Sequence, residues 1–406
     1  MLCGFAPNLN SLLLFRIMQG LGGGGMVPVS QSILAGAFPP EKRGQGFALF
    51  GIAVVVAPVV GPTLGGWIAD NFSWQWCFLI NGPVGVVALG LIGALLRESK
   101  DALAYRKRFL QQGRAFDLVG FVLVATFLGA LEIALDRGLE DDWFSSRFIV
   151  IASAICALAF VAMIPWELSR RNPMIDVRMV ATRQFGASFL VMLGTGAILL
   201  ATTQYLPQLV QQNFGYTATW AGLVLTPGGI VTVFMMYDMT KVNSDLGFWF
   251  FATSRIYIGI GLPLVFLPII AASYDGVAPD KTDMASALIN VARNTGGSIG
   301  ISLVNNVLAH REQFHQSRLV ELANPSTSQY QNTLKQLMDY FTAHGSSLAQ
   351  AQQQAFAWIG QQVQTQASYL AYVDVFWTLT LISLAAVPLA LTLRNVKLGG
   401  AAAMAH

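Results

Sequence analysis

The sequence carries little charge. Only 11% of its 406 residues are Asp, Glu, Lys or Arg, whereas 54% are hydrophobic. Soluble domains carry roughly 25% charged residues, so a soluble fold of this composition would lack the polar surface that keeps it in water. The apolar residues recur in blocks about twenty residues long, the length of helix that crosses ~30 Å of hydrocarbon. The composition excludes an ordinary soluble protein and predicts an all-α membrane protein.

Cysteine is scarce as well. The three cysteines, Cys3, Cys77 and Cys156, lie far apart, and no Cys-x-x-Cys pair exists. This pattern indicates neither a disulfide framework nor a zinc site. His310 and His315 are five residues apart, a spacing that keeps them from sharing the face that helical metal ligands need. We therefore expect no metal.

Enzyme motifs are missing too. The sequence has no His-Glu-x-x-His, no phosphate-binding Gly-x-x-x-x-Gly-Lys-Ser/Thr and no Gly-x-Ser-x-Gly. Gly20-x-Gly22-x-x-Gly25 formally matches a dinucleotide fingerprint, but it lies inside an apolar block with no preceding strand. We predict that the chain is not an enzyme and uses no cofactor. If it transports, its energy must come from a gradient, because no ATP site is present.

Apolar runs separated by polar breaks predict ten membrane spans, and residues 1–10 fit the end of an earlier one. The spans lie near residues 11–35, 46–69, 77–96, 117–136, 147–167, 185–206, 219–237, 248–272, 284–308 and 372–393. The intervening segment 309–371 is rich in Gln and Ala, and we expect one or two surface helices there. It is either a solvated loop or a surface that contacts a partner.

Lys and Arg occupy every second loop as far as about residue 215. They gather in 41–43, 97–114 and 170–183, whereas the loops at 70–71 and 140–142 are acidic. Because Lys and Arg in short loops stay in the cytoplasm, this alternation assigns the basic loops to the inside. Counting onward would place 309–371 inside as well, but the few cations there neither support nor refute that count.

Several charges lie inside the apolar blocks. A charge at mid-membrane costs roughly 2.5–3.5 kcal/mol on insertion scales, so such residues face a cavity or a partner, or else lie near helix ends and reach the headgroups. We favour a buried position for Arg16 and the headgroup interpretation for Asp136, and both interpretations stay open for Glu132. The remaining candidates are Arg255 and Arg293.

The second predicted span combines small residues with proline. Gly61 and Gly65 are four residues apart, a spacing that lets another helix approach closely. Pro58 and Pro62 each remove a backbone hydrogen bond and bend a helix. We predict a bent helix that packs tightly at a moving interface.

Three motifs resemble the major facilitator superfamily. Arg16-x-x-Gln19-Gly20-x-Gly22 resembles the fourth-helix motif of these transporters. Gly61-Pro62-x-x-Gly65-Gly66 resembles the fifth-helix antiporter motif, which occurs in exporters rather than uptake carriers. The stretch from Trp74 to Gly85 resembles the start of the sixth helix.

Further segments are similar to one subfamily, the EmrB-type multidrug exporters, which are drug:proton antiporters. They are 135–146, 206–209, 215–222 and Asn290-x-x-Arg293-x-x-Gly296-Gly297-Ser298-Ile299-Gly300. The resemblance implies a helical bundle of about fourteen spans and export of hydrophobic drugs across the bacterial inner membrane in exchange for protons. It also implies an EmrA-type periplasmic adaptor, a TolC-type outer-membrane channel and no nucleic acid partner.

The chain departs from this family pattern in two places. It begins where the third helix of the family ends, and one span is missing between about 236 and 249. Restoring that span would put 309–371 on the periplasmic side. The resemblance then implies five parts. They are a remainder of the N-terminal bundle (1–96), a basic loop with two linker helices (97–167), a C-terminal bundle lacking a span near 237–248 (168–308), a polar loop (309–371), and the last span with its tail (372–406).

The resemblance also bears on the proton carrier. In the family an acid on the first helix is a prime candidate, with the fourth-helix arginine as its neighbour. This chain keeps Arg16, and Glu132 is its best remaining intramembrane acid. The alternatives are a non-transporting remnant of such an exporter and an uptake carrier of the same fold.

Overall fold

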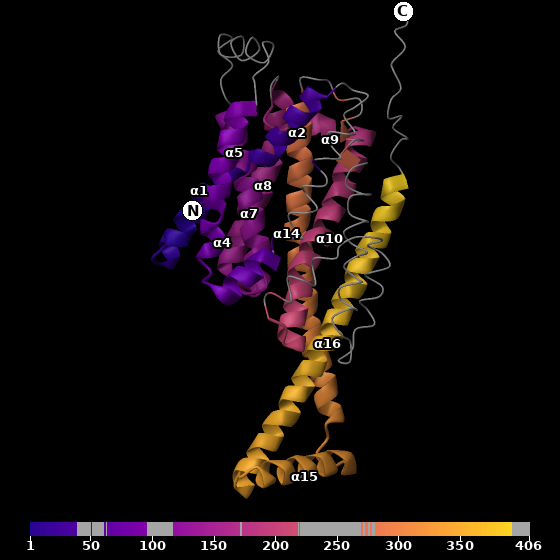
Figure 1. The fold of residues 1–406 in the computed structure, drawn as a ribbon. Helices are drawn as coiled ribbons and strands as arrows, with labels where there is room; N and C mark the ends of the chain where they lie inside the picture. Colours follow the sequence, from indigo (N-terminus) through magenta and orange to yellow (C-terminus); the bar gives the residue numbers. More distant parts are fainter. Residues whose placement is uncertain are drawn as a thin grey trace, which may run out of the picture.

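The structure is a computed structural model that describes residues 1–38, 50, 61, 63–95, 117–170, 173–217, 219, 269–270, 273–274, 277 and 281–391. The regular secondary structure of these residues is helical throughout (Figure 1). Six of the described helical stretches are long and apolar enough to cross a membrane. The predicted all-α membrane fold is confirmed.

The linker helices follow the sequence prediction closely. Helix α7 (Leu118–Arg137) and helix α8 (Arg147–Ser169) match the apolar runs at 117–136 and 147–167. Asp117 caps α7, since its Oδ1 accepts a hydrogen bond from the Gly120 N–H at 2.9 Å. The same carboxylate accepts the Trp166 Nε1–H of α8 at 3.1 Å, so one residue both starts α7 and ties it to α8.

The N-terminal helices are more broken than predicted. The expected span 11–35 is divided at Gly24–Gly25 into α1 (Leu9–Gly23) and α2 (Met26–Ala37). The expected span 77–96 is made by α4 (Trp76–Leu79) and α5 (Asn81–Leu95). A single 3-10 turn, η1 (Leu2–Phe5), precedes α1. Most of the expected spans 46–69, 219–237 and 248–272, and the segment 237–248, lie outside the described residues.

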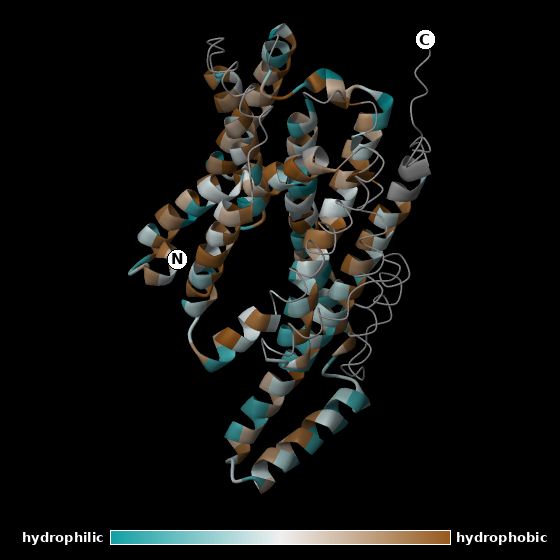
Figure 2. Ribbon diagram, turned by 45° about the horizontal axis from the view of Figure 1, so that its top comes forward, coloured by the Kyte–Doolittle hydropathy of each residue, from teal (hydrophilic) through white to brown (hydrophobic). Residues whose placement is uncertain are grey.

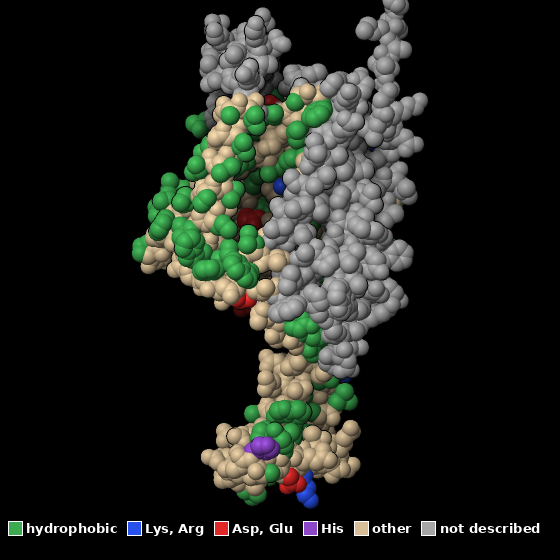
Figure 3. Space-filling model, in the orientation of Figure 1, with side chains coloured by type: hydrophobic (Ala, Val, Ile, Leu, Met, Phe, Trp, Pro, Cys, Tyr) green, Lys and Arg blue, Asp and Glu red, His purple; other side chains and the backbone are tan. Residues whose placement is uncertain are grey.

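Burial is uneven along the chain. Helix α1 contains no buried residue, and hydrophobic side chains of α1 and α5 are widely exposed, as the green side chains in Figure 3 show. By contrast, the largest buried cluster is built mainly by α10 (Arg183–Phe214), α14 (Thr282–Leu322) and α16 (Leu348–Leu391). Apolar side chains exposed on helices of this length are what acyl chains cover in a bilayer.

Close backbone contact holds α10 against α14. A Cβ atom added at Gly196 would collide with the carbonyl oxygen of Arg293, and one at Gly296 would collide with that of Leu193. Glycine lets the two helices approach at these points because it carries no side chain. The tight pair is therefore α10–α14, and α16 packs along it.

Helices α14 and α16 are longer than a membrane crossing requires. Helix α14 has 41 residues and α16 has 44, which makes them about 61 and 66 Å long at 1.5 Å per residue, twice the hydrocarbon thickness. Their extensions form a stalk with α15 (Ser328–Ala343) lying across its end (Figure 1). Hydrophilic residues, coloured teal in Figure 2, are frequent along this stalk.

The stalk changes the interpretation of segment 309–371. The predicted spans 284–308 and 372–393 do not end at the membrane but continue into that segment without a break. Helix α15 is the surface helix expected there, and it packs Leu334 against α16.

Candidate functional site

The cavity at Glu132

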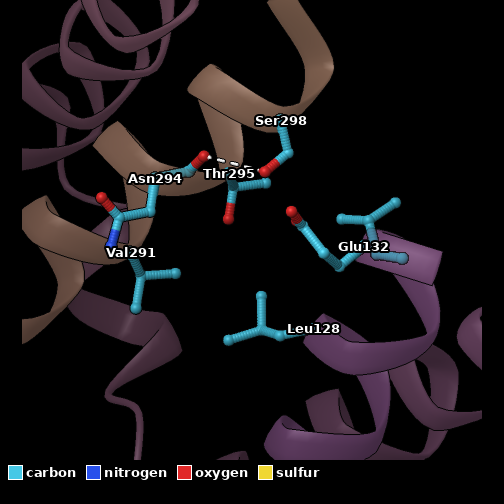
Figure 4. A pocket seen from close by; sticks show the side chains of 7 residues that line it. Leu128, Glu132, Val291, Asn294, Thr295 and Ser298 are labelled. Carbon is cyan, nitrogen blue, oxygen red and sulfur yellow. Dashed lines mark hydrogen bonds between the residues drawn. The ribbon is translucent and has the colours of Figure 1, made fainter. Parts of the chain in front are cut away.

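An acidic residue lines a cavity between α7 and α14. The cavity has a volume of about 310 Å³. The Glu132 carboxyl group points across it toward Thr295 and Ser298 of α14 (Figure 4). The wall is completed by Leu128, Leu131, Val291 and Asn294. One acid therefore faces two hydroxyl groups across a cavity whose lining is part polar and part apolar.

Helical spacing builds this arrangement. Leu128 and Glu132 are four residues apart and share one face of α7. Val291, Thr295 and Ser298 share one face of α14 by the same spacing. The hydroxyl groups of Thr295 and Ser298 on this face lie opposite the acid. Sequence reasoning singled out Glu132 but missed Thr295 and the cavity, because it could not pair α7 with α14.

Glu132 makes no hydrogen bond or ion pair with any described residue. A carboxylate without a partner at membrane depth is costly. Glu132 is exposed rather than buried, so its carboxyl group is open to solvent or to a ligand. An acid placed in this way can hold a positively charged group.

Asp136 lies one turn further along α7 and is exposed near the helix end. Its neighbour Arg137 forms ion pairs with Glu140 at 3.4 Å and Asp141 at 3.3 Å. Asp136 does not line the Glu132 cavity. This placement agrees with the headgroup interpretation favoured for Asp136.

A polar contact between α2 and α14

A second polar cluster joins α2 to α14. Gln31 is 2% exposed, and its Oε1 accepts hydrogen bonds from Ser286 Oγ at 2.5 Å and Asn290 Nδ2 at 2.9 Å. Asn290 Nδ2 also donates to the Ser286 carbonyl of its own helix at 2.8 Å. Buried polar groups that satisfy one another in this way fix two helices in a defined register.

Asn290 was a candidate from the sequence, whereas Gln31 was missed. The available signal was an amide within an apolar block, Met26–Ala37, where an uncompensated amide is expensive. Arg293, one turn after Asn290, is half-buried, and its Nε donates to Asn294 Oδ1 at 3.4 Å. Arg293 does not line the Glu132 cavity among the described residues.

The arginine and glycine motifs

The prediction that Arg16 is buried is wrong. Its side chain is exposed, donates to Gln19 Oε1 at 3.3 Å and lies over the Phe78 ring at 4.7 Å. The reason is that α1 buries no residue, so its arginine can pack only on α4 beside it. The structure nevertheless brings two sequence motifs together, since Arg16 and Gln19 belong to the first and Phe78 to the stretch 74–85.

The glycine motif does not make the predicted tight packing among the described residues. A Cβ added at Gly20, Gly61 or Gly65 would meet no atom within 4 Å. Gly66 is half-buried. Pro62 and Arg255 lie outside the described residues. The close helix approach expected at Gly61 and Gly65 occurs instead between α10 and α14, at Gly196 and Gly296.

Asp70 links two segments that are far apart in the sequence. Its Oδ2 accepts the Thr219 N–H at 2.9 Å and the Thr219 hydroxyl at 2.6 Å. These hydrogen bonds lower the pKa of the Asp70 carboxyl below its usual value, because they stabilise the ionised form. The acidic loop after the second predicted span therefore contacts the start of the seventh.

Comparison with known proteins

Comparison with known proteins shows extended similarity. A family model described as Major Facilitator Superfamily matches residues 1–301. The multidrug export protein EmrB of Escherichia coli K12 is 35% identical over 408 residues, covering 92% of this chain and 76% of the relative. EmrB of Haemophilus influenzae is 31% identical, with 93% and 76% covered. The fatty acid resistance protein FarB of Neisseria gonorrhoeae is 31% identical, with 86% and 72% covered.

Proposed function

This chain belongs to the major facilitator superfamily, and from that premise we propose that it exports hydrophobic small molecules across the bacterial inner membrane in exchange for protons. The family makes it a multi-pass membrane transporter rather than an enzyme. Relatives named for multidrug export support the direction and the substrate class. The motif Gly61-Pro62-x-x-Gly65-Gly66 favours an exporter over an uptake carrier.

The observation that carries the proposal is the unpaired carboxyl of Glu132 in its cavity between α7 and α14 (Figure 4). An antiporter needs an intramembrane acid that binds a proton in one state and releases it in the other. A proton moving down ~100 mV releases about 2.3 kcal/mol, which sustains roughly a fiftyfold concentration ratio of substrate. Glu132 is the residue that we assign to this exchange.

The movement that accompanies exchange would alter the contact between α2 and α14. Transporters of this kind open a central site to one side and then the other by rocking one bundle against the other. Gln31 on α2 and Asn290 on α14 would then belong to different moving parts. Their hydrogen bond would form in one state and break in the next.

The stalk would extend outside the membrane and contact other proteins there. Beyond the predicted spans, α14 continues for residues 309–322 and α16 for residues 348–371, about 21 and 36 Å of helix. We place it on the periplasmic side, where an EmrA-type adaptor and a TolC-type outer-membrane channel would continue the export route. The lipid bilayer and hydrophobic substrates are the remaining partners of the proposal.

Transport in proteoliposomes tests the proposal. The full chain would be reconstituted, a pH gradient imposed, and accumulation of a fluorescent hydrophobic cation followed. We expect accumulation on the side from which protons leave, and its collapse when an uncoupler is added. Movement of the cation together with protons would identify an uptake carrier. Absence of any gradient-driven movement in oriented, folded protein would identify a non-transporting remnant.

A further inference from the structure

A second groove lies between α14 and α16, away from Glu132. Its volume is about 490 Å³. It sits where the predicted spans 284–308 and 372–393 meet the stalk, because residues 306–311 and 374–381 line it. One wall is polar and includes His310, Arg311 and Asp374, and the other is apolar and includes Val307, Trp377 and Leu381. The groove thus combines a polar, charged wall with an apolar wall at the predicted membrane boundary.

Arg311 is held in a fixed orientation within this groove. Its Nε donates to Asp374 Oδ2 at 2.5 Å, and its guanidinium lies over the Phe314 ring at 4.8 Å. Bonding through Nε leaves the two terminal nitrogens of the guanidinium outside that ion pair. Those two nitrogens form the fork that grips phosphate or carboxylate oxygens. The side chain is 42% exposed, so a ligand can reach the fork.

Two histidines lie beside the ion pair, of which His310 lines the groove and His315 does not. His315 Nε2 lies 2.7 Å from the same Asp374 oxygen, so that carboxylate is shared between two neighbours. His310, which lines the groove, bonds the Asn306 carbonyl through Nδ1 at 2.9 Å. Among the described residues that line the groove, Arg311 is the one Lys or Arg and Asp374 the one carboxylate, and that carboxylate is already bonded by Arg311 Nε and His315 Nε2.

The apolar wall is suited to acyl chains. Trp377 is 44% exposed and Leu381 61% exposed, although both lie within the predicted last span. Exposed apolar side chains at this depth are surrounded by lipid, and tryptophan is enriched at the membrane boundary. A ligand with an anionic headgroup and apolar tails would contact both walls at once.

We propose that this groove binds an anionic phospholipid, with the phosphate on the Arg311 fork and the acyl chains along Leu381. A phospholipid is favoured over a soluble anion because the apolar wall is exposed at membrane depth, where lipid is always present. The bound lipid fills the junction between α14 and α16 at the base of the stalk. This site is separate from the Glu132 cavity and does not depend on which substrate is exported.

Native mass spectrometry of the intact chain tests the proposal. The protein would be extracted from bilayers of phosphatidylcholine with added phosphatidylglycerol, and retained lipids counted. Arg311→Gln removes the fork, and the matched control Arg318→Gln removes an exposed cation of the same helix that also lies over Phe314, at 5.7 Å. We expect one phosphatidylglycerol on the wild type and the control, and roughly tenfold weaker retention on Arg311→Gln, as a charge-assisted pair predicts.

Because Arg311→Gln also breaks the ion pair with Asp374, a second pair of variants separates binding from folding. Leu381→Gln alters the apolar wall, whereas Leu384→Gln alters an exposed leucine of α16 that does not line the groove. Weaker retention in Leu381→Gln alone supports the site. Equal retention in wild type, Arg311→Gln and Leu381→Gln would overturn it, as would equal retention of phosphatidylcholine. Displacement of the lipid by millimolar inorganic phosphate would show a free-phosphate site instead.

Discussion

Gln31 and Asn290 lie 259 positions apart in the sequence and share a buried hydrogen bond of 2.9 Å. The bond joins an N-terminal helix to a C-terminal one and is reinforced by Ser286 at 2.5 Å. In a transporter that works by rocking, a contact of this kind is a latch for one state. Hydrogen bonds suit such a contact better than an apolar interface does, because water can replace the lost hydrogen bonds when the two helix bundles separate.

Gln31→Ala should therefore loosen the α2–α14 contact. Removing the shared acceptor leaves Ser286 and Asn290 buried with fewer partners, which costs about 1–3 kcal/mol. We expect a lower thermal midpoint in detergent and faster alkylation of a cysteine introduced at Ser286. Ser30→Ala is the control, because Ser30 is exposed and bonds only the Met26 carbonyl of its own helix among the described residues. Equal behaviour of the two variants would show that the contact is not a latch.

Gly296→Ala should disturb the α10–α14 pair strongly. The added methyl would collide with the Leu193 carbonyl oxygen, and relief requires the helices to separate. Overpacking of this kind costs typically 1–3 kcal/mol. Gly360→Ala on α16, where a Cβ would meet nothing within 4 Å, should be neutral or stabilising. Thermal unfolding of the two variants measures the difference, and a Gly296→Ala protein as stable as wild type would refute the close approach.

Asp70 should make the contact with Thr219 sensitive to acid. Its folded pKa is lowered from 3.8, so its stabilising contribution is present above that unfolded value and disappears as pH falls through the folded pKa. We expect Asp70→Asn to be less stable than wild type at pH 7 and to match it at strongly acidic pH. Unfolding curves of the two proteins at several pH values measure this. A constant difference across the whole range would mean that the Asp70 charge does not contribute.

The sequence was informative where composition alone decides structure. The predicted ends of helices α7 and α8 lie within two residues of the observed ends, because a long apolar run leaves few alternatives to a membrane-spanning helix. The sequence was uninformative where a helix continues beyond its apolar part. The outer parts of α14 and α16 contain too few apolar residues to be recognised as continuations of spans, yet both helices continue through them without a break.

The candidate site shows the same division. An acid in an apolar run marked Glu132 as unusual, but Thr295 and Ser298, which face it across the cavity, lie on a helix more than 160 residues later (Figure 4). Arg16 was misplaced because the cost of a charge in hydrocarbon does not say whether a buried cavity or the face of a neighbouring aromatic ring accommodates the charge. Phe78 does so here.

Glu132 is the residue that we propose exchanges a proton for substrate. The most direct measurement follows the pH inside proteoliposomes after a substrate gradient alone is imposed on wild type, Glu132→Gln and Glu140→Gln. Glu140 is an exposed acid beyond the end of α7 and serves as the matched control. We expect substrate-driven proton movement in wild type and in Glu140→Gln. In Glu132→Gln we expect substrate flux without proton movement. Undiminished proton movement in Glu132→Gln would contradict the proposal.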